Sequence, residues 1–382
     1  MRNLLTTTYL TLSLSLGTVS SAWGADYFRG LDAYASGDYA TALREWESLA
    51  RQGDAKAQRN LGLMYLDGEG VPLDYKMAVK WFRLAAEQGN SDAQFNLGFM
   101  YDVGRGVPKD YKGAVKWFRL AAEQGNGDAR TALGMAYDKE KVDVPQDYKS
   151  AVKWFRLAAE QGDAVAQGAL AWMYSNGWGV PRNYKTAVKW FRLAAEQENA
   201  PAQRNLALMY HLGKGVPQDY KTAMKWYGLA AEQADDDALT VLGGMYNKGW
   251  GVPRDYKTAV TLFQLAAEQG DEDAQTVLGG MYNKGWGVPR NYKTAVKWYR
   301  LAAEQGDAEA QYYLGVMYDL GEGVPESVVH AFAWLNLAAA QGDKSAAKSK
   351  DIARARMTAE QIAQAQKLSS EWLRKNPKLM RQ

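Results

Sequence analysis

The chain has 382 residues, and its 46 Lys and Arg nearly balance its 43 Asp and Glu. Such a balance gives no strong positive field of the kind that attracts nucleic acids or anionic membranes, so a nucleic-acid partner is not expected. The absence of cysteine excludes disulfides, thiolate metal ligands, cysteine nucleophiles and a lipid anchor attached to cysteine.

Residues 1–24 have the pattern of an export signal. Arg2 is followed by a modestly apolar run that ends in the small residues Ala22 and Gly24. The run is short and rich in hydroxyl groups compared with a membrane span, which needs about 20 mostly apolar residues. We therefore expect a cleaved signal peptide, cut after Ala22, Gly24 or Ala25, with an uncleaved membrane anchor as the alternative.

From residue 46 onward a tryptophan recurs at a nearly constant spacing of 35 to 37 residues. A period of this length predicts a stacked repeat array, which grows by addition and can form one long domain. One position of the series holds Leu262 instead. The tryptophans are Trp46, Trp81, Trp117, Trp154, Trp190, Trp226, Trp298 and Trp334.

Residues 25–53 are predicted to form two short helices around a Gly37-Asp38 turn and to cap the N-terminal end. Each later unit has an Asp or Asn that can cap a first helix, a Gly-x-Gly-Val-Pro loop, and a second helix that contains the tryptophan. A glycine or alanine recurs inside the first helix, as at Gly98, and predicts that a neighbouring helix backbone passes close to it. Residues 343–382 leave the period and are predicted to form two C-terminal capping helices.

The pattern Asp92-Ala93-Gln94, Gly98-Phe99-Met100-Tyr101, Gly104-Arg105-Gly106-Val107-Pro108 and Ala114-Val115-Lys116-Trp117-Phe118 resembles the Sel-one-like repeat (SLR), a relative of the tetratricopeptide repeat. This resemblance implies an all-α fold, a right-handed α-solenoid of stacked antiparallel helix pairs. It also implies an adaptor for protein complexes, in bacteria often periplasmic or secreted. The eight expected repeats span residues 54–342, at about 54–89, 90–125, 126–162, 163–198, 199–234, 235–270, 271–306 and 307–342.

Nothing in the sequence indicates catalysis. The two histidines, His211 and His330, fall in different repeats and in no metal-binding spacing. No phosphate-binding loop or nucleophile elbow is present, and the Gly-x-Gly loops run into Val-Pro, as turns do. The recurring glutamates, such as Glu87, are interpreted as structural hydrogen-bonding groups. We therefore expect no enzyme activity, no cofactor and no metal.

Candidate binding residues are those that differ between repeats at fixed places. In the first helices, positions outside the apolar stripe hold Phe95, Phe99, Trp172 and Tyr312. These positions share one helix face. The resemblance places that face on the groove of the solenoid. Surface drift between duplicated repeats is the alternative.

Three loops replace a charged residue of the other repeats with tryptophan and follow it with arginine. A position that tolerates Glu or Lys faces solvent, so a tryptophan there can serve as a contact anchor. The alternatives are that the indole folds back on the neighbouring repeat, or that duplication copied a neutral change. The residues are Trp178, Arg182, Trp250, Arg254, Trp286 and Arg290.

Together these observations predict an exported, non-enzymatic scaffold that binds a protein or peptide partner. Two other functions remain as alternatives. One is a cell-wall glycan-binding or enzyme-accessory protein, with the loop tryptophans stacked on sugar rings. The other is a membrane-tethered organiser of the envelope.

Overall fold

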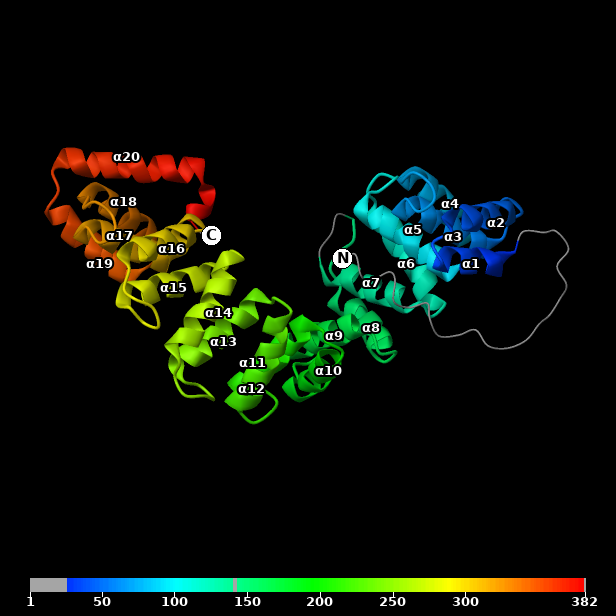
Figure 1. The fold of residues 1–382 in the computed structure, drawn as a ribbon, viewed down its shortest axis with the longest axis horizontal. Helices are drawn as coiled ribbons and strands as arrows, with labels where there is room; N and C mark the ends of the chain where they lie inside the picture. Colours follow the sequence, from blue (N-terminus) through cyan, green and yellow to red (C-terminus); the bar gives the residue numbers. More distant parts are fainter. Residues whose placement is uncertain (1–25, 140–142, 381–382) are drawn as a thin grey trace. The chain divides into compact units, whose positions relative to one another are not determined.

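The computed structural model describes residues 26–139 and 143–380, so the predicted signal segment lies outside the described residues. The chain divides into two compact units, residues 1–146 and 147–382. The described residues form helices and no strand, as Figure 1 shows. None of these helices is long and apolar enough to cross a membrane.

The described residues of the first unit form seven helices. They are α1 (Tyr27–Ala35), α2 (Tyr39–Arg51), α3 (Ala55–Asp67), α4 (Tyr75–Glu87), α5 (Ser91–Val103), α6 (Tyr111–Glu123) and α7 (Gly127–Asp138). Consecutive helices pack on one another throughout this unit. The predicted pair of helices around Gly37 is therefore confirmed.

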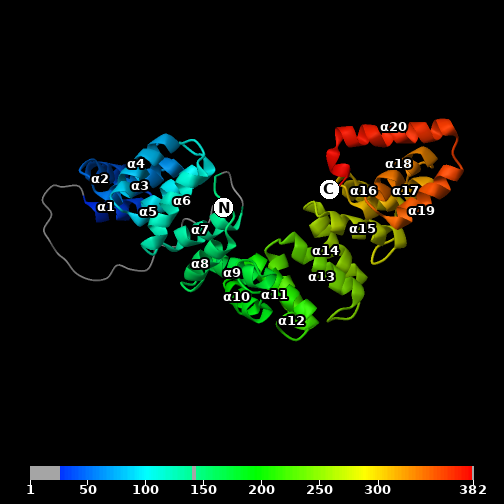
Figure 2. The ribbon, with the colours of Figure 1, turned by 180° about the vertical axis from the view of Figure 1, so that it is seen from behind.

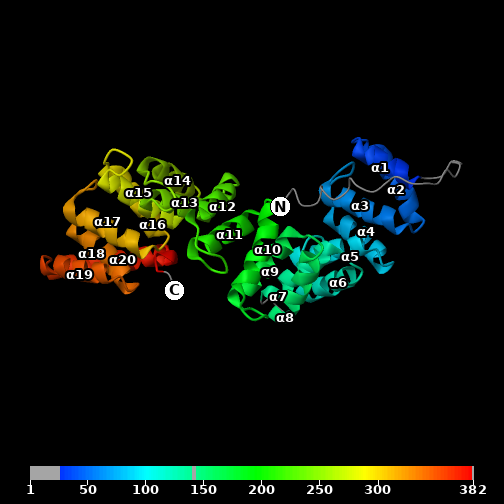
Figure 3. The ribbon, with the colours of Figure 1, turned by 90° about the horizontal axis from the view of Figure 1, so that it is seen from below.

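In its described residues, the second unit has thirteen α-helices and a short 3₁₀ helix. They are α8 (Tyr148–Ala159), α9 (Ala164–Asn176), α10 (Tyr184–Glu196), α11 (Ala200–Leu212), α12 (Tyr220–Glu232), α13 (Asp236–Lys248), α14 (Tyr256–Glu268), α15 (Glu272–Lys284), α16 (Tyr292–Glu304), α17 (Ala308–Leu320), α18 (Val328–Ala340), α19 (Lys344–Ala355), α20 (Ala359–Lys375) and η1 (Pro377–Leu379). Helix α20 packs along α18, which is visible from the front and from behind (Figures 1 and 2). The η1 segment returns to α16 (Figure 3).

The predicted helix caps are confirmed. Asn90 accepts a hydrogen bond from the amide of Ala93 at the start of α5, and Asp110 accepts one from Gly113 at the start of α6. Helix α5 ends at Gly104, which has a left-handed φ of 72°. These contacts satisfy backbone groups that the helix ends would otherwise leave unpaired.

The hydrophobic cores inside the array are shared between neighbouring repeats. Phe82 of α4 is fully buried and packs in one cluster with Leu97 and Met100 of α5, in the next repeat. Because such a core takes residues from the neighbouring repeat, a repeat buries its apolar face only when it is stacked.

The sequence predicts that a neighbouring helix backbone requires a small residue at Gly98. This prediction is wrong, because the nearest group is a side chain. A Cβ at Gly98 would come within 2.7 Å of the Phe118 ring, and one at Gly279 within 2.8 Å of the Tyr299 ring. An aromatic side chain of the repeat's own second helix therefore fills the space. The close approach to backbone occurs instead at the second loop glycine. There a Cβ on Gly106 would overlap the carbonyl of Tyr75 in the preceding repeat.

A buried glutamine joins successive repeats. Gln94 of α5 donates to the carbonyl oxygen of Ala86 (3.1 Å) and accepts from Nε2 of Gln124 (2.7 Å). The recurring glutamates, by contrast, are exposed, as at Glu87. At several of these places the structural hydrogen bond is made by the glutamine that follows the glutamate, as at Gln88, Gln124 and Gln197.

Candidate interaction surface

The three loop tryptophans fold back on the preceding repeat. Trp286 stacks on Tyr256, the first residue of α14, with ring centroids 5.4 Å apart and planes 15° apart. The ammonium of Lys284 also lies over this indole, 4.4 Å from its centroid. Trp286 nevertheless remains 39% exposed. Trp286 therefore packs on the neighbouring repeat, which was the alternative to a free contact residue. Part of its ring still stays open to solvent.

Trp250 has the same arrangement one repeat earlier. It stacks on Tyr220 at 5.6 Å and 13°, and Lys248 lies 4.4 Å from its centroid. Trp250 is half-buried. The repetition of the whole group in two neighbouring repeats shows that the tyrosine, the lysine and the tryptophan form one local unit.

Trp178 lies differently because a second tryptophan stands beside it. It stacks on Tyr148 at 5.2 Å and meets Trp172 of α9 edge to face, with centroids 6.2 Å apart. Trp172 is 43% exposed and Trp178 is 36% exposed. A first-helix residue and a loop residue that were singled out separately thus form one exposed aromatic pair.

The three loop arginines lie against tyrosines of their own repeats. The guanidinium carbons of Arg182, Arg254 and Arg290 are 5.5 to 5.9 Å from the rings of Tyr184, Tyr256 and Tyr292. Among the residues that the structure describes, these arginines form no ion pair. Their charges stay available on the surface.

The loops of consecutive repeats form a continuous row. In each loop one side chain packs on the tyrosine that opens the second helix of the preceding repeat. Lys214 lies over Tyr184 (5.5 Å), just as Trp250 covers Tyr220 and Trp286 covers Tyr256. We call residues 176–185, 212–221, 248–257 and 284–293 the loop edge.

The other first-helix candidates are less accessible than Trp172. Phe95 is half-buried against the ring of Phe118 (5.8 Å), and half-buried Phe99 packs on the core between α4 and α5. Tyr312 packs against the cluster that α18, α19 and α20 form. These three residues lie on the predicted helix face, but only Trp172 presents a large exposed ring there.

Comparison with known proteins decides the family. The Sel1 repeat family matches eight consecutive segments, which together span residues 55–343. The chain belongs to the Sel1 repeat family. The matched segments are 55–90, 91–126, 127–163, 164–199, 200–235, 236–271, 272–307 and 308–343.

Two solved structures of Sel1 type resemble the chain over most of its length. A Sel1 repeat protein from Oxalobacter formigenes is 34% identical, with 89% of this chain and 97% of that chain covered at a TM-score of 0.64. A protective antigen of uropathogenic Escherichia coli strains with an SLR fold is also 34% identical, with 92% and 84% covered at a TM-score of 0.53. No curated protein matches the chain. Sel1 repeat proteins are generally scaffolds for protein–protein interaction.

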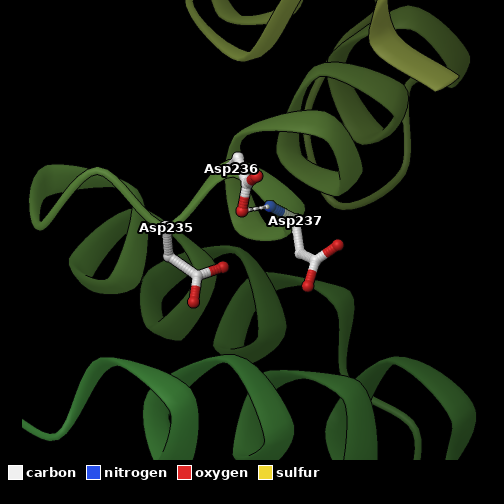
Figure 4. Close-up of side chains that lie close together, drawn as sticks. All are labelled: Asp235, Asp236 and Asp237. Carbon is white, nitrogen blue, oxygen red and sulfur yellow. Dashed lines mark hydrogen bonds between the residues drawn. The ribbon is translucent and has the colours of Figure 1, made fainter. Parts of the chain in front are cut away.

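One acidic cluster in this Sel1 array has the composition of a cation site. Asp235, Asp236 and Asp237 lie together at the start of α13 (Figure 4). However, Asp235 caps the helix by accepting from the Ala238 amide, and Asp236 accepts from the Asp237 amide. The guanidinium of Arg204 pairs with both Asp235 and Asp237. This one guanidinium offsets part of the negative charge of the cluster.

The two histidines are packed among aromatic rings. His211 meets Trp250 and Tyr220 edge to face at 5.2 and 5.4 Å, and burial followed by nearby Lys248 lowers its pKa. His330 stacks on Tyr318, its Nδ1 lies 2.9 Å from Ser327 Oγ, and burial again lowers its pKa. These surroundings are those of packing residues.

Sequence reasoning missed the tyrosines and lysines that hold the loop tryptophans. The signal was present, because a tyrosine opens the second helix of almost every repeat, and Lys248 and Lys284 each stand two residues before a loop tryptophan. Tyr256 precedes Trp286 by the same number of residues as Tyr220 precedes Trp250. Only stacking of repeats brings these residues together, and a pattern within one repeat does not show it.

Proposed function

We propose that the chain is an exported, non-enzymatic scaffold that binds a protein or peptide partner through its first-helix face and its loop edge. The observation that carries the proposal is the exposed pair Trp172 and Trp178, where the two surfaces meet. Exposed tryptophan is costly in water and is enriched among residues that dominate binding energy. The general role of the family as an interaction scaffold supports this function.

Export through the N-terminal segment is part of the proposal, with a periplasmic or secreted location. The composition of residues 1–24 supports it. One of the similar structures is that of a protective antigen, which is compatible with an exported protein. Mass measurement of the protein from periplasm and medium tests export. Retention of Met1 in membrane-bound protein would favour the tethered alternative instead.

Glycan binding is less well supported, because a sugar ring stacks on an open aromatic face. Tyr256 already covers one face of Trp286, and Lys284 lies over the same ring. A partner would therefore contact the edges of these rings and the cationic side chains more than open ring faces.

Affinity capture with a matched pair of variants tests partner binding. Trp172→Ala with Trp178→Ala should abolish capture of the proteins that wild type retains from envelope and medium, as read by mass spectrometry. Leu193→Ala with Leu265→Ala removes similarly exposed apolar groups from the second helices and should leave capture unchanged. Equal capture by all three proteins would contradict the proposed surface.

A further inference from the structure

The loop edge has the chemistry of a site for acidic peptide. We propose that it binds a segment of a partner protein rich in Asp and Glu, with carboxylates on its basic groups and apolar contacts on its indole edges. This inference rests on the proposed scaffold function and specifies the partner's chemistry.

Charge is concentrated on this edge, although the whole chain is nearly neutral. Its four segments contain ten Lys and Arg against two Asp. All ten basic residues are exposed. They are Arg182, Lys185, Lys214, Lys221, Lys248, Arg254, Lys257, Lys284, Arg290 and Lys293. A row of cations of this density attracts and orients a complementary anionic partner.

The two acidic residues of the edge do not neutralise these cations. Asp219 and Asp255 cap α12 and α14, where each carboxylate accepts hydrogen bonds from two backbone amides and one threonine hydroxyl. Those bonds to hydroxyl and amides lower both pKa values, so the carboxylates are charged at neutral pH and are directed to the helix ends. In the described part of the chain, the edge has no ion pair.

The packing also gathers cations from neighbouring repeats. Arg182 and Lys214 come from different loops, yet both lie over the ring of Tyr184, at 5.9 and 5.5 Å. Like charges that are held around one ring repel each other, and a carboxylate that binds between them would relieve this repulsion. Arginine adds geometric selectivity because its planar group can bind a carboxylate through two hydrogen bonds.

The loop edge ends before the eighth repeat, where the loop loses its basic residues. The eighth repeat has the same loop, but residues 320–329 contain Glu322 and Glu326 and no Lys or Arg. The positive charge therefore differs between repeats and does not follow from the repeat itself. Half-exposed indoles between the cations fit a peptide with apolar side chains better than they fit a uniform polyanion.

Binding of a fluorescein-labelled peptide of alternating Glu and Gly residues, with one Tyr, tests this inference on the purified 382-residue chain. The variant is Lys214→Glu, Lys248→Glu and Lys284→Glu. Its matched control is Lys153→Glu, Lys225→Glu and Lys297→Glu, which reverses three exposed lysines that also lie over indoles but belong to second helices. Circular dichroism establishes that all three proteins are folded to the same extent.

We expect the wild type to bind the peptide in a salt-dependent way, the edge variant to bind about tenfold or more weakly, and the control to match the wild type. Equal losses in both variants, or no binding to the wild type at low salt, would overturn the inference. Tighter binding of single-stranded DNA or sulfated glycan than of the peptide would also overturn it, as would self-association that the edge variant abolishes. If partner capture still depends on Trp172 and Trp178 in any of these cases, the scaffold function stands without the acidic segment.

Discussion

The side chain of Gln88 at the end of α4 donates through Nε2 to Oε1 of Gln58 in α3, across 2.7 Å. Gln58 in turn donates to the carbonyl oxygen of Ala50 in the preceding helix pair. The bond to Ala50 crosses the junction between successive helix pairs, and the glutamine pair fixes the two helices within one repeat. A buried polar network of this kind is costly unless every member is paired.

Gln94→Ala should lower the free energy of unfolding by about 1–3 kcal/mol, because Ala86 loses a donor at a buried carbonyl. Gln94→Arg should cost less. The third repeat has Arg130 at this place, where its Nε donates to the carbonyl oxygen of Ala122 (3.2 Å). Urea unfolding followed by circular dichroism measures both values. Equal stability of wild type and the alanine variant would show that the network contributes little.

Neighbouring glycines of α15 should respond in opposite directions to alanine. Gly279→Ala places a methyl group 2.8 Å from the Tyr299 ring, so we expect a loss of about 1–3 kcal/mol from overpacking. At Gly280 the nearest atom is the Tyr299 hydroxyl oxygen at 3.5 Å, an ordinary contact. Gly280→Ala should therefore gain about 0.5–1 kcal/mol from helix propensity. Thermal unfolding compares the pair, and a stabilised Gly279→Ala protein would refute the steric explanation.

Trp286→Ala should destabilise the chain by about 1–2 kcal/mol, because it removes the stack on Tyr256 between two repeats. Trp286→Arg should retain part of this energy. The second repeat has Arg105 at the same place, 5.3 Å from the ring of Tyr75. Denaturant unfolding of both variants provides the measurement. If the two lose the same energy, the cation does not replace the indole in this contact.

Stability should fall as the pH drops from about 7 to about 5, because both histidines have folded-state pKa values below the ordinary 6.5. The unfolded chain binds protons at a higher pH than the folded chain, so protonation favours unfolding in this range. His211→Asn with His330→Thr uses residues found at these places in other repeats and should flatten the dependence. Urea midpoints across this range test it, and an unchanged slope in the double variant would assign the effect elsewhere.

Local features of the fold were predictable because short segments determine them. The caps Asn90 and Asp110, the stop at Gly104 and the capping box of Thr358 and Gln361 each depend on a few adjacent residues. The environment of Gly98 was not predictable in the same way, since a small residue accommodates a ring and a backbone equally well.

The candidate surface was predictable as a set of positions but not as an arrangement. Trp172 and Trp178 were both singled out, yet their contact depends on how a helix end and its loop turn together. The degree of exposure depends on which residue of the preceding repeat each indole meets. Tyr148, Tyr220 and Tyr256 lie about one repeat away in the sequence, and their role follows only from stacking.

The dependence of each loop on the preceding tyrosine makes the length of the basic row adjustable in whole steps. Deleting residues 236–271 would leave Asp235 to cap α15 and would present Trp286 to Tyr220, in the place that Trp250 occupies. Duplicating the same residues would add one more cationic loop in register. The array can therefore gain or lose binding loops for a repetitive ligand while the contacts between repeats stay the same in kind. Duplication alone can change its avidity.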